Sequence, residues 1–153
     1  MTVDAQIAAL GLELPEALAP AFQYVAVVEY GGTAWVSGQI PRSGKNVLMI
    51  GKAGAEVSLD QARLAARACV LQGLAQLRQT LGSLERVQRV LKVTGFVASA
   101  PGFTQQPQVM DAASELLVQV FGDAGRHARS AIGVAELPRG VPVEVEMVVA
   151  VRE

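Results

Sequence analysis

The sequence is poor in the residues that build most metal and catalytic sites. Its 153 residues include one cysteine, Cys69, and one histidine, His127. A lone cysteine cannot form an internal disulfide, and together with one histidine it cannot supply the ligands of a structural zinc site. The chain also lacks a Walker loop, a dinucleotide-binding glycine fingerprint and a nucleophile elbow. These absences point away from metal and nucleotide chemistry.

An excess of charge and long apolar runs are missing as well. The formal net charge is −1, so no overall positive field attracts nucleic acid. Net charge does not exclude a local basic patch. Residues 1–6 lack the basic stretch and apolar core of a secretory signal, and no apolar run reaches membrane-spanning length. We therefore expect a cytoplasmic protein that neither crosses a membrane nor depends on nucleic acid.

The composition is apolar for a chain of this size. Hydrophobic residues make up 51% and charged residues 18% of the sequence. Because a small monomer needs a more polar surface, we expect apolar surface to be covered in an oligomer, most simply a symmetric homo-oligomer. The length suits one domain with its own core. We assign residues 1–153 to a single domain, with residues 1–20 as an N-terminal extension.

Apolar residues at helical spacing predict two long helices. The first begins after Ser58, which can form a capping box with Gln61, and ends at Gly82. The second is expected at residues 107–121, and a short turn of helix at residues 4–10.

The two scarce residue types receive ordinary roles. Cys69 falls inside the apolar stripe of the first helix, which favours a small buried hydrophobe over a nucleophile. His127 lies in a polar loop, which favours a surface or local capping role over catalysis.

The remaining apolar segments predict strands. We expect them at residues 25–30, 33–38, 47–50, 87–99, 129–134 and 143–152, with a loop at 40–46. Gly31-Gly32 suits a hairpin turn, and most of residues 129–146 is interpreted as a second, apolar hairpin. The order of elements predicts an α+β domain of two layers, with two helices on one face of a mixed sheet. The other face, which carries Val148 and Ala150, is expected to be covered by another subunit.

Fixed charges interrupt the segment at residues 129–146. Arg129 stands at its start, while Glu144 and Glu146 share one face of the last strand. Charge on apolar strands is costly to bury, so it needs a partner. Arg129 could bind a ligand carboxylate, with a glutamate accepting a proton or orienting water. An Arg–Glu salt bridge at a subunit interface is equally compatible with the residues. Ser130 should point to the opposite side of its strand from Arg129.

Four ordered motifs resemble the Rid family, also called the YjgF or liver perchloric-acid-soluble-protein family. They are the C-terminal signature (Arg129-Ser130, residues 133–138 and 143–146), the second strand at residues 35–41, the strand at residues 93–97, and Tyr24 placed thirteen residues before Ser37. The resemblance covers residues 24–152, nearly the whole chain.

The resemblance implies a chorismate-mutase-like α+β fold and a homotrimer with a barrel-like core and three sites between subunits. The best-known members of the family are deaminases. They hydrolyse 2-aminoacrylate and related enamines and imines, giving 2-keto acids and ammonia without a cofactor. A small 2-imino or 2-keto acid is therefore the implied partner. Other members are described as ribonucleases or translation inhibitors.

The resemblance implies that Arg129 binds the substrate carboxylate and that Glu144 positions the attacking water. Glu146 becomes a flanking, structural acid. Five further residues would line the site and bind the substrate: Tyr24, Ser37, Gly38, Asp111 and Ala131. Because an imine is already electrophilic, orientation and a held water can suffice for hydrolysis.

Three departures mark a divergent subgroup. Ala131 stands where the well-known deaminases carry a cysteine that helps hold the water, so binding could persist while turnover falls. Asp111 replaces an asparagine of the binding site, and its charge would disfavour a second anionic group on the ligand or shift the preference towards a cationic one. Extra residues at 104–107 alter the rim. The alternatives are therefore a non-catalytic carboxylate-binding trimer and, more weakly, a ribonuclease, since aromatic residues are only 5% of the chain.

Overall fold

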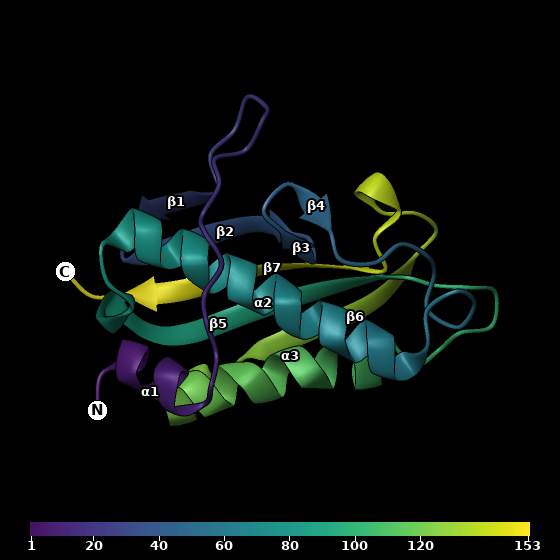
Figure 1. Cartoon of the computed structure of the whole chain (residues 1–153). Helices are drawn as coiled ribbons and strands as arrows, with labels where there is room; N and C mark the ends of the chain where they lie inside the picture. Colours follow the sequence, from purple (N-terminus) through teal and green to yellow (C-terminus); the bar gives the residue numbers. More distant parts are fainter.

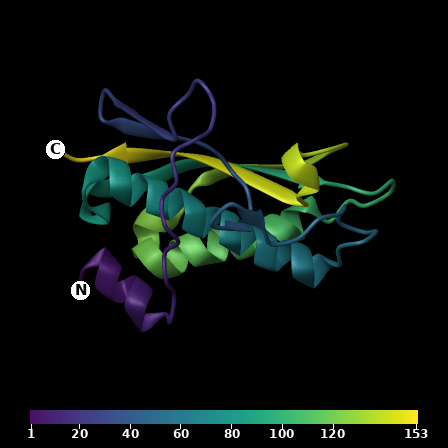
Figure 2. The same cartoon turned by 45° about the horizontal axis from the view of Figure 1, so that its top comes forward.

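Two long helices lie side by side on one face of a five-stranded sheet (Figure 1). The computed structural model describes all residues 1–153. The helices are α1 (Val3–Ala9), α2 (Leu59–Leu81) and α3 (Gln106–Phe121). The sheet contains β1 (Val27–Tyr30), β2 (Thr33–Gln39), β5 (Val87–Ala98), β6 (Ala128–Val134) and β7 (Val143–Val151). Viewed along the layers, α2 and α3 both lie below the sheet, which confirms the predicted α+β arrangement (Figure 2).

The strand order is β1-β2-β7-β5-β6, and only β5 and β6 run parallel. The predicted hairpin at residues 129–146 is therefore wrong, because β5 lies between β6 and β7. The physical reason is that α3 links β5 to β6, and a crossover helix of this kind joins parallel neighbours. The last strand then inserts between β2 and β5, where both of its edges are hydrogen-bonded, and β6 is left at the edge.

Local signals predicted most boundaries well. The Ser58 hydroxyl accepts from the Gln61 amide at 3.1 Å, and the Gln61 side chain accepts from the Ser58 amide at 2.9 Å, forming the expected capping box. Gly82, with φ of 82°, ends that helix. Gly31 and Gly32 have φ of 59° and 78°, as their hairpin turn requires.

The strand expected at residues 47–50 is wrong. Only Val47 belongs to a strand, within the two-residue hairpin of β3 (Arg42–Ser43) and β4 (Asn46–Val47). Leu48 and Ile50 are exposed. Side chains with strand propensity need a neighbouring strand to pair with, and none lies beside this segment.

The core lies between the helices and the sheet. Along β7 every odd position from Val143 to Val151 is buried against the helices, and the even positions face the other way. Cys69 is buried, and its Sγ lies 3.5 Å from the Val143 carbonyl oxygen. Burial, and then the charge of Glu144, raise the pKa of the Cys69 thiol, which confirms the prediction of a small buried hydrophobe.

The face of the sheet away from the helices is uncovered. We call it the open face; Val28, Trp35, Ile132 and Val148 all lie on it. Trp35 is 57% exposed and stands opposite Val148 of β7. A second subunit over this face stays a prediction, and the exposed apolar side chains are the reason for it.

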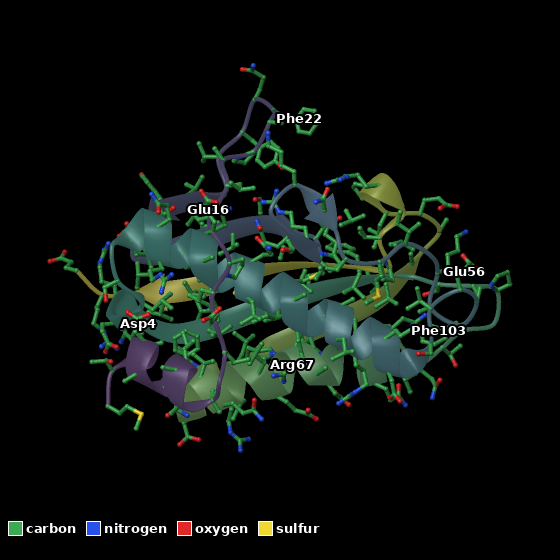
Figure 3. All side chains as sticks on the ribbon, viewed as in Figure 1. Asp4, Glu16, Phe22, Glu56, Arg67 and Phe103 are labelled. Atoms are coloured by element: carbon green, nitrogen blue, oxygen red, sulfur yellow. The ribbon has the colours of Figure 1, made fainter.

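The first twenty residues are tied to the helical layer. The Gln6 side-chain amide donates to the Gln119 carbonyl at 2.9 Å, and Asp4 forms a salt bridge with Arg78. The following loop projects from the molecule with Phe22 near its tip (Figure 3). No helix combines the length and the hydropathy needed to cross a bilayer.

The core predicts a sharp contrast between two leucines of α2. Leu77 is fully buried, whereas Leu64 is 63% exposed on the same helix. Leu77→Ala should lower the free energy of unfolding by about 2–5 kcal/mol, because it leaves a cavity. Leu64→Ala, the matched control, should change it by less than about 0.5 kcal/mol. Urea denaturation measures both; equal losses would contradict the described core.

Candidate active site

Arg129 reaches from β6 to α3 and is held there along one edge of its guanidinium. Its Nη1 donates to Asp111 Oδ1 at 2.9 Å and to Ser114 Oγ at 3.1 Å. Its Nη2 has one long contact, 3.5 Å, with the Pro107 carbonyl oxygen. Within the chain the ion pair of Arg129 is therefore with Asp111, and neither glutamate of β7 is its partner.

The hydrogen bonds continue from Ser114 to His127. The Ser114 Oγ lies 2.9 Å from His127 Nε2, and His127 Nδ1 lies 2.6 Å from the Gly125 carbonyl oxygen. Burial, and then the nearby charge of Arg129, lower the pKa of His127 despite the opposing bond to Gly125. The bond to Gly125 fits the predicted local role, and the bond to Ser114 was not foreseen.

We call Arg129, Asp111, Ser114 and His127 the arginine half of the site. Ser114 was not among the residues predicted for the site. The signal that could have found it is spacing: Ser114 follows Asp111 by three residues on α3, and residues three apart share one face of a helix.

Glu144 lies on the open face, half-buried beside β2. A Cβ added to Gly38 would stand 2.2 Å from Glu144 Oε1, so the glycine leaves room for the carboxylate in this position. A register irregularity between Val36 and Gln39 accompanies this close approach. Burial, and then the charge of Glu146, raise the pKa of Glu144. We call Glu144, Glu146 and Gly38 the glutamate half.

Ser37 precedes Gly38 in β2, and Tyr24 lies two residues before Ala26, to which Ser37 binds. The amide and the hydroxyl of Ser37 both donate to the Ala26 carbonyl, at 2.9 and 3.0 Å, which ties β2 to the segment before β1. Tyr24 is 52% exposed in that segment. Both residues thus belong to one region, but no direct hydrogen bond joins them.

The two halves lie on opposite faces of the sheet. Arg129 stands beside Val93, and Val93 beside Met147, so all three face the helices. Glu144 has the other parity on β7 and faces away. Ala131 shares the side of Arg129, whereas Ser130 accepts from Lys92 on the open face at 3.1 Å, as predicted. Within one chain, Arg129 and Glu144 therefore project from opposite faces of the sheet.

Comparison with known proteins places this fold in a family. Residues 4–144 match the family model described as "YjgF/chorismate mutase-like, putative endoribonuclease". The chain therefore belongs to the YjgF, or Rid, family, as its motifs indicated. It is 47% identical over 148 residues to Protein TCP17 of Trypanosoma cruzi, covering 96% of this chain and 92% of that protein.

Solved structures divide into near and distant relatives. The protein Atu1372 of Agrobacterium tumefaciens superposes with a TM-score of 0.90 at 36% identity, covering 98% of this chain and 92% of that one. A Shewanella oneidensis protein described as "a putative endoribonuclease" gives 0.95 at 30% identity, with coverage of 99% and 100%. The YjgF gene product of E. coli gives 0.63 at 26% identity, with coverage of 92% and 98%. The lower TM-score with the E. coli protein agrees with the prediction that this chain belongs to a divergent branch of the family.

The glutamate half predicts a measurable coupling between its two acids. Glu146→Gln removes the neighbouring negative charge, so the pKa of Glu144 should fall towards its ordinary value. The part of the rise in the Glu144 pKa that burial causes should remain. Carboxyl-carbon NMR titration measures this, with the exposed Glu13→Gln as the matched control. A Glu144 pKa that is the same in both variants would contradict the coupling.

Proposed function

We propose that the protein is a cofactor-independent deaminase that hydrolyses small 2-imino acids to 2-keto acids and ammonia. The observation that carries the proposal is the half-occupied guanidinium of Arg129. Asp111 and Ser114 use both hydrogens of Nη1, whereas Nε has no acceptor in the protein and Nη2 has only the long contact with Pro107. The edge formed by Nε and Nη2 matches the two oxygens of a carboxylate.

The separation of the two halves supports a site shared between copies. The arginine half lies at the edge strand β6, and the glutamate half lies on the open face with its uncovered apolar residues. A contact from the edge of one copy to the face of the next is head-to-tail and can close as a ring. A homotrimer of this kind brings Arg129 of one copy to Glu144 of its neighbour.

The proposed reaction needs little more than orientation. Arg129 holds the carboxylate, and Glu144 accepts a proton from water as the water oxygen attacks the imine carbon. The π electrons of the C=N bond move to nitrogen, which takes the proton from Glu144. The carbinolamine hydroxyl then loses its proton to Glu144, which passes it to the nitrogen. As the C–N bond breaks, the oxygen forms the carbonyl, ammonia leaves and the 2-keto acid remains. The raised pKa of Glu144 makes its carboxylate a stronger base for the first step.

Asp111 narrows the proposed substrate class. Its carboxylate lies against Arg129 and cancels much of the positive charge that a ligand meets. A ligand with a second anionic group near Asp111 is repelled, so monocarboxylic imino acids are favoured.

The second candidate is a trimer that binds small carboxylates without catalysis. Ala131 favours it, because it puts a methyl group on the side of Arg129 where the resemblance expects a thiol that helps hold the water. The free edge of Arg129 would still bind the carboxylate.

The proposed deaminase should lose activity when the side chain that binds the carboxylate is removed. Arg129→Ala should slow keto-acid formation from freshly generated 2-iminobutyrate by about a hundredfold, because charge-assisted hydrogen bonds are lost. Arg126→Ala is the matched control, since Arg126 is exposed and its ion partner is Asp123. The rate above the solvent reaction is the measurement.

Three outcomes separate the candidates. No rate above solvent for several imino acids would eliminate the deaminase. Thermal protection of that inactive protein by 2-oxobutyrate would establish the binding trimer instead. RNA cleavage that survives Arg129→Ala would contradict both.

Shared sites predict complementation between two inactive variants. Arg129→Ala and Glu144→Gln each disable a different half, so mixed trimers contain some sites with both intact groups. Random reassembly of equal amounts should restore about one quarter of the wild-type rate. The variants mixed without unfolding and refolding provide the control. Failure of co-refolded mixtures to regain activity, with trimers shown by light scattering, would contradict a site between subunits.

A further inference from the structure

A row of hydrogen bonds runs from Arg129 through Ser114 and His127 to the Gly125 carbonyl. The groups at its two ends limit where the protons of the row can lie. Arginine can only donate, and the Gly125 carbonyl can only accept. In the neutral ring, His127 Nδ1 must carry the proton, because its partner at 2.6 Å, the Gly125 carbonyl oxygen, can only accept. Nε2 is then an acceptor, so the Ser114 hydroxyl donates to it at 2.9 Å while the Ser114 oxygen accepts from Arg129. A neutral imidazole protonated on Nδ1 thus gives every group in the row a hydrogen-bond partner.

We propose that His127, in this neutral form, is a positioning residue that acts through Ser114 to orient the guanidinium of Arg129 for a carboxylate ligand. The ligand part of this inference rests on the proposed function. His127 itself touches no ligand. His127 orients the Ser114 hydroxyl, so that the Ser114 oxygen presents a lone pair to Arg129 Nη1. This bond keeps the Nε–Nη2 edge of the Arg129 guanidinium in one orientation.

The backbone around His127 is held in place. A Cβ on Gly125 would lie 2.2 Å from the Leu117 carbonyl oxygen, so a glycine is needed where the 3-10 helix Gly122–Gly125 rests on α3. This close contact fixes the Gly125 carbonyl that His127 binds. Packing of Gly125 on α3 therefore fixes the carbonyl at one end of the row. The hydrogen bonds through His127 and Ser114 then fix the orientation of Arg129 at the other end.

Protonation of His127 would break the pattern of donors and acceptors. An Nε2 proton would point at the Ser114 oxygen, which already accepts from the cationic Arg129, and the Ser114 proton would lose its acceptor. The charge that acts on the ring is Arg129 on β6, whose own ion partner is Asp111 on α3. Arg126, next to His127 in the chain, pairs with Asp123 of the 3-10 helix, and Arg89 on β5 donates to the Arg126 carbonyl. Glu115 on α3 pairs with Arg63. Burial and Arg129 keep the pKa of His127 below its ordinary value, so the neutral form predominates at pH 7.

The chain has one histidine, so NMR observes this ring without overlap. In untagged protein labelled with ¹⁵N-histidine, we expect the Nδ1–H form at pH 7.5. Ser114→Ala should raise the pKa of His127, because Nε2 loses its donor. A ring protonated on Nε2, or a pKa unmoved by Ser114→Ala, would overturn the proposal.

Ligand binding tests the effect on Arg129. With 2-oxobutyrate as the probe, Ser114→Ala and His127→Leu should each weaken binding about three- to tenfold, as expected for one lost hydrogen bond. His127→Gln, whose Oε1 can accept from Ser114, should restore most of the affinity. Gln119→Ala, an exposed change on α3, is the matched control. Wild-type affinity should fall as the pH drops through the pKa of His127; a rise would show simple attraction by an imidazolium and overturn the proposal.

A ligand-free measurement separates this proposal from the proposed function. The ¹⁵N relaxation of Arg129 Nε should report a more mobile guanidinium in Ser114→Ala and His127→Leu than in wild type. If 2-oxobutyrate fails to bind even the wild type, the proposed function fails, and the mobility of Arg129 still decides the role of His127. Unchanged mobility in both variants would refute that role.

Discussion

The alternation of side chains across paired strands is the constraint on which the site depends. In β7 it sends the odd-numbered residues into the core and Glu144 and Glu146 to the open face. The same alternation passes through β5 to β6 and turns Arg129 towards α3. A shift of one residue in β7 would exchange its faces and bury Glu144 and Glu146 in the core, at high cost. The same shift in β6 would turn Arg129 away from α3. Register therefore fixes both the core and the separation of the charged groups.

Sequence patterns were most informative where the interactions are local. Ser58 and Gln61 are three residues apart, so their capping box could be predicted from the sequence. The alternation in β7 was equally visible and correctly placed both glutamates on one face. Arg129 and Glu144 were recognised because fixed charges stand out on apolar strands. These features need no knowledge of distant parts of the chain.

The errors arose where distant segments decide the outcome. Residues 129–146 look like a hairpin locally, but β7 gains two neighbours by inserting between β2 and β5. The segment after Val47 has strand-forming side chains and no partner strand. Likewise, Asp111 and Ser114 meet Arg129 only because α3 packs across β6. Pairing between remote elements does not appear in periodicity, so neither the partner of Arg129 nor the role of His127 could be read in advance.

The contact between Gly38 and Glu144 ties two remote positions to each other. The carboxylate occupies the space that any side chain at position 38 would need. A larger residue there requires the Glu144 side chain to move, because an added Cβ would lie 2.2 Å from Oε1 and 2.9 Å from Cδ. The position of the proposed base thus depends partly on the absence of a methyl group on another strand.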